Sequence, residues 1–215
     1  MVLPPLIPAL FLKRLNRFVG EIFIKGGIEK ALIRNTGRLE ELLKFGNTVF
    51  VREKSTGKYK YEILLARGEG SLVCIESHYA TRLYEEFLKK NGVKSIKREV
   101  KVGNHRFDFL VENKLVEVKS VNLVKNGVAL FPDAPTGRGT SHVRELIKHK
   151  DKYDPLLVFV VQREDFERFM PNCERDAEFC KIFYEYVAKG FPVEVYKCKV
   201  GLKEVKIVEK IPFEI

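Results

Sequence analysis

Three ionisable residues lie close together in a stretch of the chain that is otherwise rich in apolar residues. Asp108 stands in one short apolar run, and Glu117 and Lys119 stand in a second run, beyond a turn-like segment at 112–114. This pattern predicts two strands joined by a tight connection. Side chains alternate between the faces of a strand, so Glu117 and Lys119 share one face. Charged groups on such strands are costly unless they bind a metal, a phosphate or one another.

These residue types fit metal-dependent hydrolysis of a phosphodiester, in which a metal polarises the phosphate and lowers the pKa of the attacking water. Magnesium prefers oxygen ligands, commonly one or two carboxylates. We expect Asp108, Glu117 and the backbone carbonyl of Val118 to bind Mg²⁺ or Mn²⁺. Lys119 could then orient the water or stabilise developing negative charge. The alternative is a structural cluster of ion pairs in a domain without activity.

The spacing Asp-x8-Glu-x-Lys resembles that of the PD-(D/E)xK nuclease superfamily, with phenylalanine in the place of its proline. The motif is loose, because a surface hairpin with a Glu–Lys pair would also match it. The neighbouring elements favour the nuclease fold. A helix at 78–90, capped by Ser77, is expected before the two strands. A helix capped by Thr140 or Ser141 and an apolar strand at 156–161 are expected after them.

A loop rich in Pro and Gly, at 132–140, leads into the second of these helices. Asp133 in this loop is a further candidate metal ligand, or else a turn or cap residue. Helix N-termini favour phosphate groups. The candidate DNA-binding residues at this end are Arg138, His142 and Arg144.

Residues 1–76 are expected to form an OB-like small β-barrel, and residues 77–215 an α/β domain of the restriction-endonuclease-like type with a mixed sheet. The first region contains five short apolar runs between turn signals, which is typical of a small barrel. The expected strands are 18–24, 31–33, 48–52, 59–66 and 72–76.

Basic and aromatic residues interleave in the barrel region, an arrangement that could hold phosphates and stack bases. The candidate DNA-binding residues are Arg14, Arg17, Arg34, Arg38, Lys58 and Lys60. Strand alternation alone also produces this pattern, by placing aromatic side chains in a core and lysines in water. Both interpretations stay open for the stretch at 58–61.

The chain is strongly basic, with a net charge of +10 and a pI of about 9.4. Such a balance favours a polyanionic partner such as nucleic acid, although a lysine-rich surface can also serve solubility alone. Many Lys and Glu residues with a single glutamine, Gln162, suggest a thermophilic source. The four cysteines form no Cys-x-x-Cys pair, so no structural zinc site is expected. Buried free thiols are the default expectation, and a Cys173–Cys180 disulfide is the alternative.

No apolar run is long enough to span a membrane, so no membrane partner is expected. Residues 1–12 are apolar but interrupted by three prolines, and they lack the features of a signal peptide. We therefore expect a cytoplasmic protein. The sequence leaves open whether it forms a homodimer.

Several motifs closely resemble those of the sugar fermentation stimulation protein A (SfsA) family: Glu117-Val-Lys-Ser-Val-Asn-Leu, Phe131-Pro-Asp-Ala-Pro-Thr-Gly-Arg-Gly and His142-Val-Arg-Glu-Leu. The resemblance covers nearly the whole chain. It implies DNA binding, an N-terminal OB-like domain, a nuclease-like C-terminal domain and an effect on genes of sugar (maltose) utilisation. It also implies nuclease-type roles for Asp108, Glu117 and Lys119, and an acidic catalytic position at Glu86. One departure is Pro135-Thr-Gly, which puts glycine where many members carry an acidic residue.

Two functions of different classes follow. The first is a DNA-binding protein with a Mg-dependent endonuclease site. The second is a non-catalytic DNA-binding transcriptional regulator whose nuclease site is vestigial. A weaker third alternative is an RNA-processing enzyme, because OB-like barrels also bind single strands.

Overall fold

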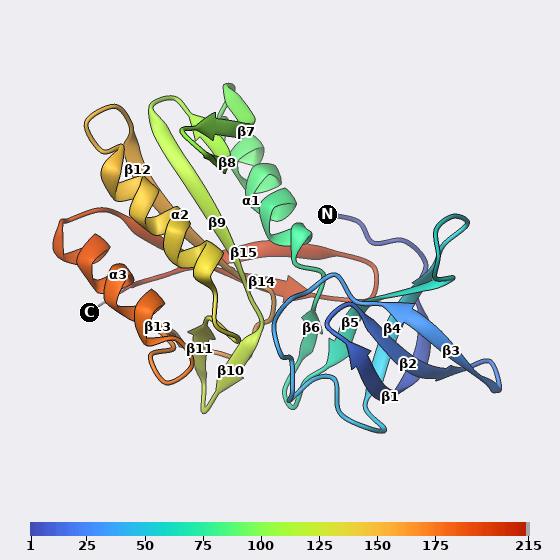
Figure 1. The fold of residues 1–215 in the computed structure, drawn as a ribbon. Coiled ribbons are helices and arrows are strands. Elements are labelled where there is room, and N and C mark those ends of the chain that lie inside the picture. Colours follow the sequence, from blue (N-terminus) through green and yellow to red (C-terminus); the bar gives the residue numbers. More distant parts are fainter. Residues whose placement is uncertain (214–215) are drawn as a thin grey trace.

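The computed structural model describes residues 1–213, in which a β-barrel and a layered α/β domain lie side by side (Figure 1). The barrel consists of β1 (Ile7–Asn16), β2 (Val19–Ile24), β3 (Gly27–Leu32), β4 (Thr48–Glu53), β5 (Tyr61–Arg67) and β6 (Leu72–Cys74). The strand order is β3-β2-β1-β4-β5-β6, and a short parallel pairing of β3 with β5 closes the sheet on itself. Apolar side chains that include Phe11, Ile22 and Ile63 fill the interior. The expected OB-like barrel is confirmed.

The first strand, β1, was not expected, because Pro4, Pro5 and Pro8 interrupt the apolar run at the start of the chain. Pro8 is the second residue of β1, opposite Phe50 of β4. Proline is tolerated near the start of a strand, where one missing N–H disturbs little of the ladder. The β1 strand continues to Asn16 and pairs with both β2 and β4.

The second domain is built on a six-stranded mixed sheet of order β15-β14-β12-β9-β8-β7. Its sheet strands are β7 (Ile96–Val102), β8 (His105–Val111), β9 (Lys114–Val121), β12 (Asp154–Val161), β14 (Val193–Val200) and β15 (Val205–Ile211). A separate three-stranded sheet contains β10 (Leu123–Lys125), β11 (Val128–Phe131) and β13 (Arg168–Pro171). The helices are α1 (His78–Lys90), α2 (Gly137–Lys148) and α3 (Ala177–Ala188). This architecture confirms the expected α/β class with a mixed sheet.

The helices cover the two faces of the large sheet (Figure 1). Helix α1 packs Leu83 and its neighbours on the face of β9 that carries Val116 and Val118. Helices α2 and α3 pack on the opposite face, which carries Leu115 and Val121. The alternation expected for β9 is therefore confirmed, and the strand is covered on both sides.

Two helix starts differ from the sequence prediction. Helix α1 begins at His78 as expected, but Ser77 does not cap it: the Ser77 hydroxyl donates to the carbonyl of Arg34, and Glu76 accepts the N–H of His78 instead. Helix α2 begins at Gly137, where Thr136 accepts the N–H of Gly139, and not at Thr140 or Ser141. The earlier start carries the N-terminus of α2 toward the strand ends.

A buried polar junction joins the two domains. The amide of Asn122 donates to the carbonyl of Cys74 and accepts from Asn35, at 2.6 and 2.8 Å. Asn35 also donates to the carbonyl of Ile75. The side-chain amide of Gln162 donates to the main-chain carbonyl of Cys74, and the main-chain carbonyl of Gln162 accepts the N–H of Cys74. The segment between barrel and α1 is thus bound by side chains from both domains.

One disulfide joins Cys173, which precedes α3, to Cys180, which lies within α3. Cys74 and Cys198 are buried free thiols. None of the described helices is long and apolar enough to span a membrane.

Arg163 extends the junction with a buried ion pair. Its guanidinium donates to both oxygens of Asp165, at 2.6 and 2.7 Å, and to the carbonyl of Asn122. Ser71 of the barrel donates to the same carboxylate at 2.8 Å. Burial opposes ionisation of Asp165, but the hydrogen bonds from Arg163 and Ser71 outweigh it and lower its pKa to about 2.

The substitution Asp165→Asn should lower the free energy of unfolding at pH 7 by about 2 kcal/mol, which corresponds to the difference between a pKa of about 2 and the ordinary 3.8. Because the pKa is depressed in the folded protein, this contribution is present above pH 4 and is lost as the pH falls toward 2. Chemical denaturation of both proteins between pH 2 and pH 7 measures it. The exposed Asp151, which is paired with Lys150, provides the control Asp151→Asn. A deficit of equal size at every pH would contradict the assignment.

Candidate active site

The strands β8 and β9 separate at the point where the predicted acidic residues lie. Their pairing runs from Val111–Lys114 to Phe109–Val116 and then stops. The carboxylate of Asp108 accepts the N–H of Val118 at 2.8 Å, in the place of a main-chain acceptor. The N–H and C=O of one strand residue point to the same side, so the Val118 carbonyl faces this gap as well.

Glu117 lies at the centre of the gap and is 4% exposed. Its Oε1 accepts from Lys119 Nζ at 2.6 Å and contacts Nδ1 of His142. Its other oxygen, Oε2, is buried and has no hydrogen-bond partner among residues 1–213. A buried carboxylate oxygen without a partner is costly, which makes it a candidate ligand atom for a cation.

The two carboxyl groups differ in their electrostatic surroundings. Burial and the neighbouring Glu117 raise the pKa of Asp108 to about 7. Burial opposes ionisation of Glu117, but Lys119 and His142 outweigh it and lower the pKa of that carboxyl. Around neutral pH, one full negative charge on Glu117 therefore stands beside a second carboxyl group that ionises only partly.

A cavity of about 560 Å³, here called the acidic lobe, opens at this gap. Its lining includes Asp108, Glu117, Val118, Lys119, His142, Arg138 and the start of α1 at Ser77 and His78. No group of three or more His, Cys, Asp or Glu side chains among residues 1–213 is arranged to hold a metal. Mg²⁺ does not require such a group, because one or two carboxylates with waters and substrate phosphates complete its shell. The carboxylates of Asp108 and Glu117, the latter with its unpartnered Oε2, fit that ligand set together with the Val118 carbonyl.

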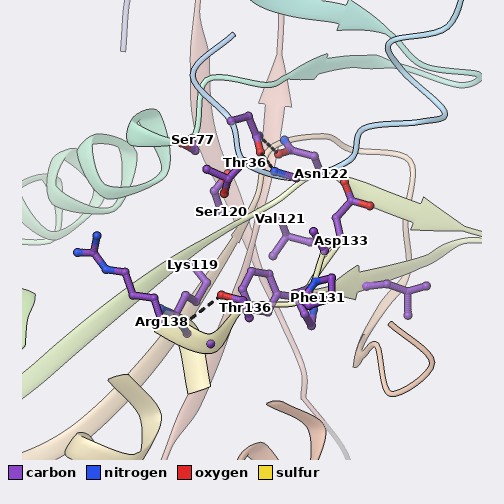
Figure 2. Close-up of a pocket in the computed structure, with 18 of the residues that line it drawn as sticks. Thr36, Ser77, Lys119, Ser120, Val121, Asn122, Phe131, Asp133, Thr136 and Arg138 are labelled. Carbon is purple, nitrogen blue, oxygen red and sulfur yellow. Dashed lines mark hydrogen bonds between the residues drawn. The ribbon is translucent and has the colours of Figure 1, made fainter. Parts of the chain in front are cut away.

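A second cavity, of about 520 Å³, lies between the barrel and the α/β domain and is here called the interdomain lobe (Figure 2). The barrel contributes Arg17 and residues 35–37, and the α/β domain contributes the loop at 130–139. Four residues line both lobes: Ser77, Lys119, Ser120 and Arg138. The two lobes are therefore adjacent compartments of one cleft.

The structure brings several of the sequence-predicted residues to this cleft. Asp108, Glu117, the Val118 backbone, Lys119 and His142 line the acidic lobe, and Arg138 and Arg17 line the cleft as well. Asp133 lies in the interdomain lobe, where its Oδ2 accepts the N–H of Leu39 at 2.7 Å. Asp133 thus holds a barrel loop and does not line the acidic lobe.

Glu86 is not part of the site. Its carboxylate is 46% exposed and pairs with the N-terminal ammonium group of Met1 at 2.7 Å. It lies more than two turns along α1 from His78, where the helix meets the acidic lobe. The expected catalytic role for Glu86 is therefore wrong.

Arg14 is a structural residue of the barrel and is not free for DNA. Its guanidinium donates to the main-chain carbonyls of Arg17, Asn35, Gly37 and Arg38, at 2.6–3.0 Å. These bonds fix the loop that carries Asn35 to the junction. The expected DNA contact by Arg14 is corrected to this role.

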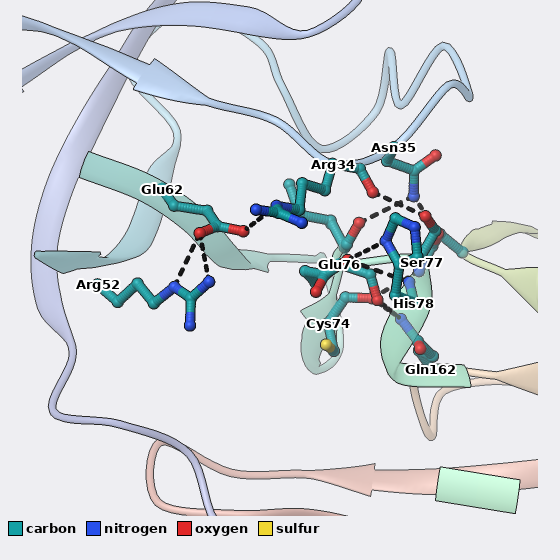
Figure 3. A network of polar contacts seen from close by, with 11 residues as sticks. Arg34, Asn35, Arg52, Glu62, Cys74, Glu76, Ser77, His78 and Gln162 are labelled. Carbon is teal, nitrogen blue, oxygen red and sulfur yellow. Dashed lines mark hydrogen bonds and ion pairs between the residues drawn. The ribbon is translucent and has the colours of Figure 1, made fainter. Parts of the chain in front are cut away.

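The other predicted basic residues lie outside the cleft. Lys58 lies over the ring of Tyr59, and carboxylates pair with Arg34, Arg38, Lys60 and Arg144. Arg34 shares the fully buried Glu62 with Arg52, at 2.9 and 2.6 Å (Figure 3). Its main-chain carbonyl accepts both the N–H and the hydroxyl of Ser77, so the barrel holds the start of α1 in place.

Sequence reasoning missed the polar residues that shape the cleft. Ser120, Asn122, Thr36 and Ser77 all line the interdomain lobe. Small polar residues in loops and at strand ends are common, and no spacing distinguishes these. The one available signal was position: Ser120 and Asn122 directly follow Lys119, which was already a candidate site residue.

Comparison with known proteins agrees with this architecture. A family model described as "Sugar fermentation stimulation protein RE domain" matches residues 78–204, and one described as "SfsA N-terminal OB domain" matches residues 12–75. The chain belongs to the SfsA family. A sugar fermentation stimulation protein homolog of Aquifex aeolicus is 70% identical over 97% of this chain and 98% of its own length. One of Carboxydothermus hydrogenoformans is 40% identical over 93% of each.

A solved structure of another SfsA family protein has the same fold. It is described as "The structure of Pyrococcus Furiosus SfsA in complex with Ca2+". The match has a TM-score of 0.90 at 32% identity, and it covers 100% of this chain and 98% of the other. The family assignment made from the motifs around residues 117–145 is therefore confirmed.

The raised pKa of Asp108 predicts a stabilising substitution. A carboxyl with a higher pKa in the folded than in the unfolded state favours folding below pH 4, and this advantage is lost as the pH rises through 7. At pH 8 in a chelator, Asp108→Asn should raise the free energy of unfolding by at least about 1 kcal/mol. The full difference between a pKa of about 7 and the ordinary 3.8 sets an upper limit of about 4 kcal/mol. Asparagine can still accept the N–H of Val118.

Denaturation at pH 5 and pH 8 tests this, and the gain should be smaller at pH 5. Asp154→Asn is the matched control, since Asp154 is exposed at the start of β12 and its carboxylate accepts a hydrogen bond from the side chain of Asn113 at 3.3 Å. A less stable Asp108→Asn protein at pH 8 would contradict the repulsion between Asp108 and Glu117.

Proposed function

We propose that the protein binds DNA and hydrolyses its phosphodiester bonds at the acidic lobe with Mg²⁺ or Mn²⁺. The observation that carries this proposal is the unpartnered, buried Oε2 of Glu117 beside Asp108, with Lys119 two residues further along the same strand. A carboxylate oxygen that is buried without a partner, beside a second carboxyl group, favours the binding of a cation. A phosphodiester enzyme uses such a cation to polarise the phosphate and activate water.

The residues of the chain have separable roles in this proposal. Asp108, Glu117 and the Val118 carbonyl would hold the metal, and the bond from Asp108 to the Val118 N–H fixes that carboxylate. His142 contacts Oε1 of Glu117 and would hold that carboxylate in orientation. Lys119 Nζ lies 2.6 Å from Oε1 of Glu117 and would stabilise negative charge on the phosphate. Arg138, at the start of α2, would bind a phosphate oxygen.

Two further facts support the proposal. A related protein, 32% identical over the whole chain, is described in complex with Ca²⁺. Ca²⁺ and Mg²⁺ both take oxygen ligands, so a divalent cation in that relative agrees with a carboxylate site here. The net charge of +10 favours a polyanionic substrate. The names of the curated relatives connect the family with sugar fermentation, and a role in sugar (maltose) utilisation is part of this proposal.

Cleavage of plasmid DNA with Mg²⁺ or Mn²⁺ tests the proposal. Asp108→Ala and Lys119→Ala should each reduce the cleavage rate by about 100-fold or more, because each removes a group that acts on the reacting phosphate. Lys114→Ala, at the exposed other end of β9, should cleave at the wild-type rate. In parallel, Mn²⁺ should raise the Tm of the wild type but not that of Asp108→Asn. Cleavage that survives both Asp108→Ala and Lys119→Ala would exclude this site.

A non-cleaving DNA-binding regulator is the second candidate. The observation that favours it is the closed ion-pair cluster in which Lys119 and His142 both contact one oxygen of Glu117. If this candidate is correct, DNA binding persists in a chelator and falls steeply with salt, in proportion to the phosphates contacted. Filter binding of duplex, single-stranded DNA and single-stranded RNA from 50 to 300 mM salt measures this. Absence of binding at low salt would contradict both candidates.

A further inference from the structure

The interdomain lobe contains basic groups without acidic partners. Arg17 and Arg138 line it, and within residues 1–213 neither guanidinium pairs with a carboxylate; Arg138 contacts only the imidazole of His142, at 3.4 Å. The carboxylate-paired arginines elsewhere are Arg34, Arg38, Arg52, Arg98, Arg106, Arg144, Arg163 and Arg175. Lys119 is a third cation of the lobe, and Asp133 is its one carboxylate. The charges of the lobe therefore favour an anionic ligand.

Main-chain donors add to these charges. Gly137 and Arg138 are the first two residues of α2, where N–H groups have no intrahelical acceptor, and both line the lobe. A Cβ atom at position 137 would meet nothing within 4 Å, so the first residue of the helix borders open space. The N-terminus of a twelve-residue helix also favours negative charge.

A buried hydroxyl without a partner points into the cleft. The Oγ atom of Ser120 is buried and has no hydrogen-bond partner, and Ser120 lines both lobes. Figure 2 shows Thr36 and Ser77 close to Ser120, with Lys119 and Arg138 below them in this view. Hydroxyls and cations around one cavity suit the oxygens of a phosphate ester.

The size of the lobe limits the ligand to a small unit. A cavity of about 520 Å³ falls in the range of pockets that enclose one small molecule, which is about 300–1,000 Å³. Barrel residues 35–37 and the loop at 130–139 bound it on two sides. A nucleotide of a single strand fits such a space, whereas a duplex does not.

We propose that the interdomain lobe is a subsite for one nucleotide of a single nucleic-acid strand. Its phosphate lies between Arg17, Arg138 and the first N–H groups of α2, and it neighbours the phosphate bound in the acidic lobe. The proposal rests on the proposed function for the identity of the ligand as nucleic acid. Since Lys119 and Ser120 line both lobes, one strand can pass from one to the other without leaving the cleft.

A short strand tests the subsite without cleavage. The probe is a fluorescent, single-stranded thymidine trinucleotide with a 5′ phosphate, measured by anisotropy in a chelator. Arg17→Gln should weaken binding about tenfold, as expected for the loss of one charge-assisted contact. Arg38→Gln is the matched control, because it removes the same charge from the barrel but Arg38 does not line the lobe. Its affinity should stay within about twofold of the wild type.

Amide chemical shifts then locate the probe. The N–H signals of Gly37 and Gly137, which lie on opposite sides of the lobe, should shift on titration in both the wild type and Asp108→Ala. Equal weakening by Arg17→Gln and Arg38→Gln, or unchanged glycine signals, would overturn the subsite. If these signals shift and Arg17→Gln is selectively weak while plasmid DNA is not cleaved, the subsite stands and the nuclease proposal fails.

Discussion

The main chain from Cys74 to Ser77 is held by side chains from both domains, and the geometry of the cleft depends on it. Asn122 and Gln162 bind the Cys74 carbonyl from the α/β side, while Asn35 and the Arg34 carbonyl bind the segment from the barrel. Buried amides are costly unless their groups find partners. The amide groups of Asn35 and Asn122 do, whereas the side-chain oxygen of Gln162 is buried with no hydrogen-bond partner among residues 1–213. This junction fixes the start of α1, and with it the Ser77 wall that both lobes share.

The second constraint is the burial of charge between β8 and β9. Glu117 is buried and Asp108 is half-buried, so each charge is stabilised only by a partner within the protein or by a bound cation. Glu117 receives Lys119 and His142, whereas Asp108 receives only the N–H of Val118. This asymmetry explains why the two pKa values move in opposite directions. It also explains why the strand pairing must end at Phe109–Val116, since continued pairing would occupy the Val118 N–H.

The sequence predicted the parts of the fold that depend on local periodicity. The strand β12, the helix α1 and the alternation of β9 follow directly from apolar spacing, and they are observed as expected. The strand β1 was missed because three prolines interrupt the apolar run around its start. The strands β10 and β13 were missed because three and four residues are too few to show an alternating pattern. The start of α2 was missed because a Thr-Gly pair reads as a turn until its cap bond is seen.

Roles that depend on tertiary partners were less accessible from the sequence. Arg14 and Arg17 are the same residue type three positions apart, yet the first donates to five main-chain carbonyls and the second lines a cavity. Three of these carbonyls, those of Asn35, Gly37 and Arg38, lie more than twenty positions away, so the local sequence does not separate the two roles. Lys119 shows the reverse case: its partner Glu117 is visible in the sequence, but its place between the two lobes is not. Because Lys119 lines both lobes and its ammonium group is bonded to Glu117, negative charge placed in either lobe acts on the same ion pair.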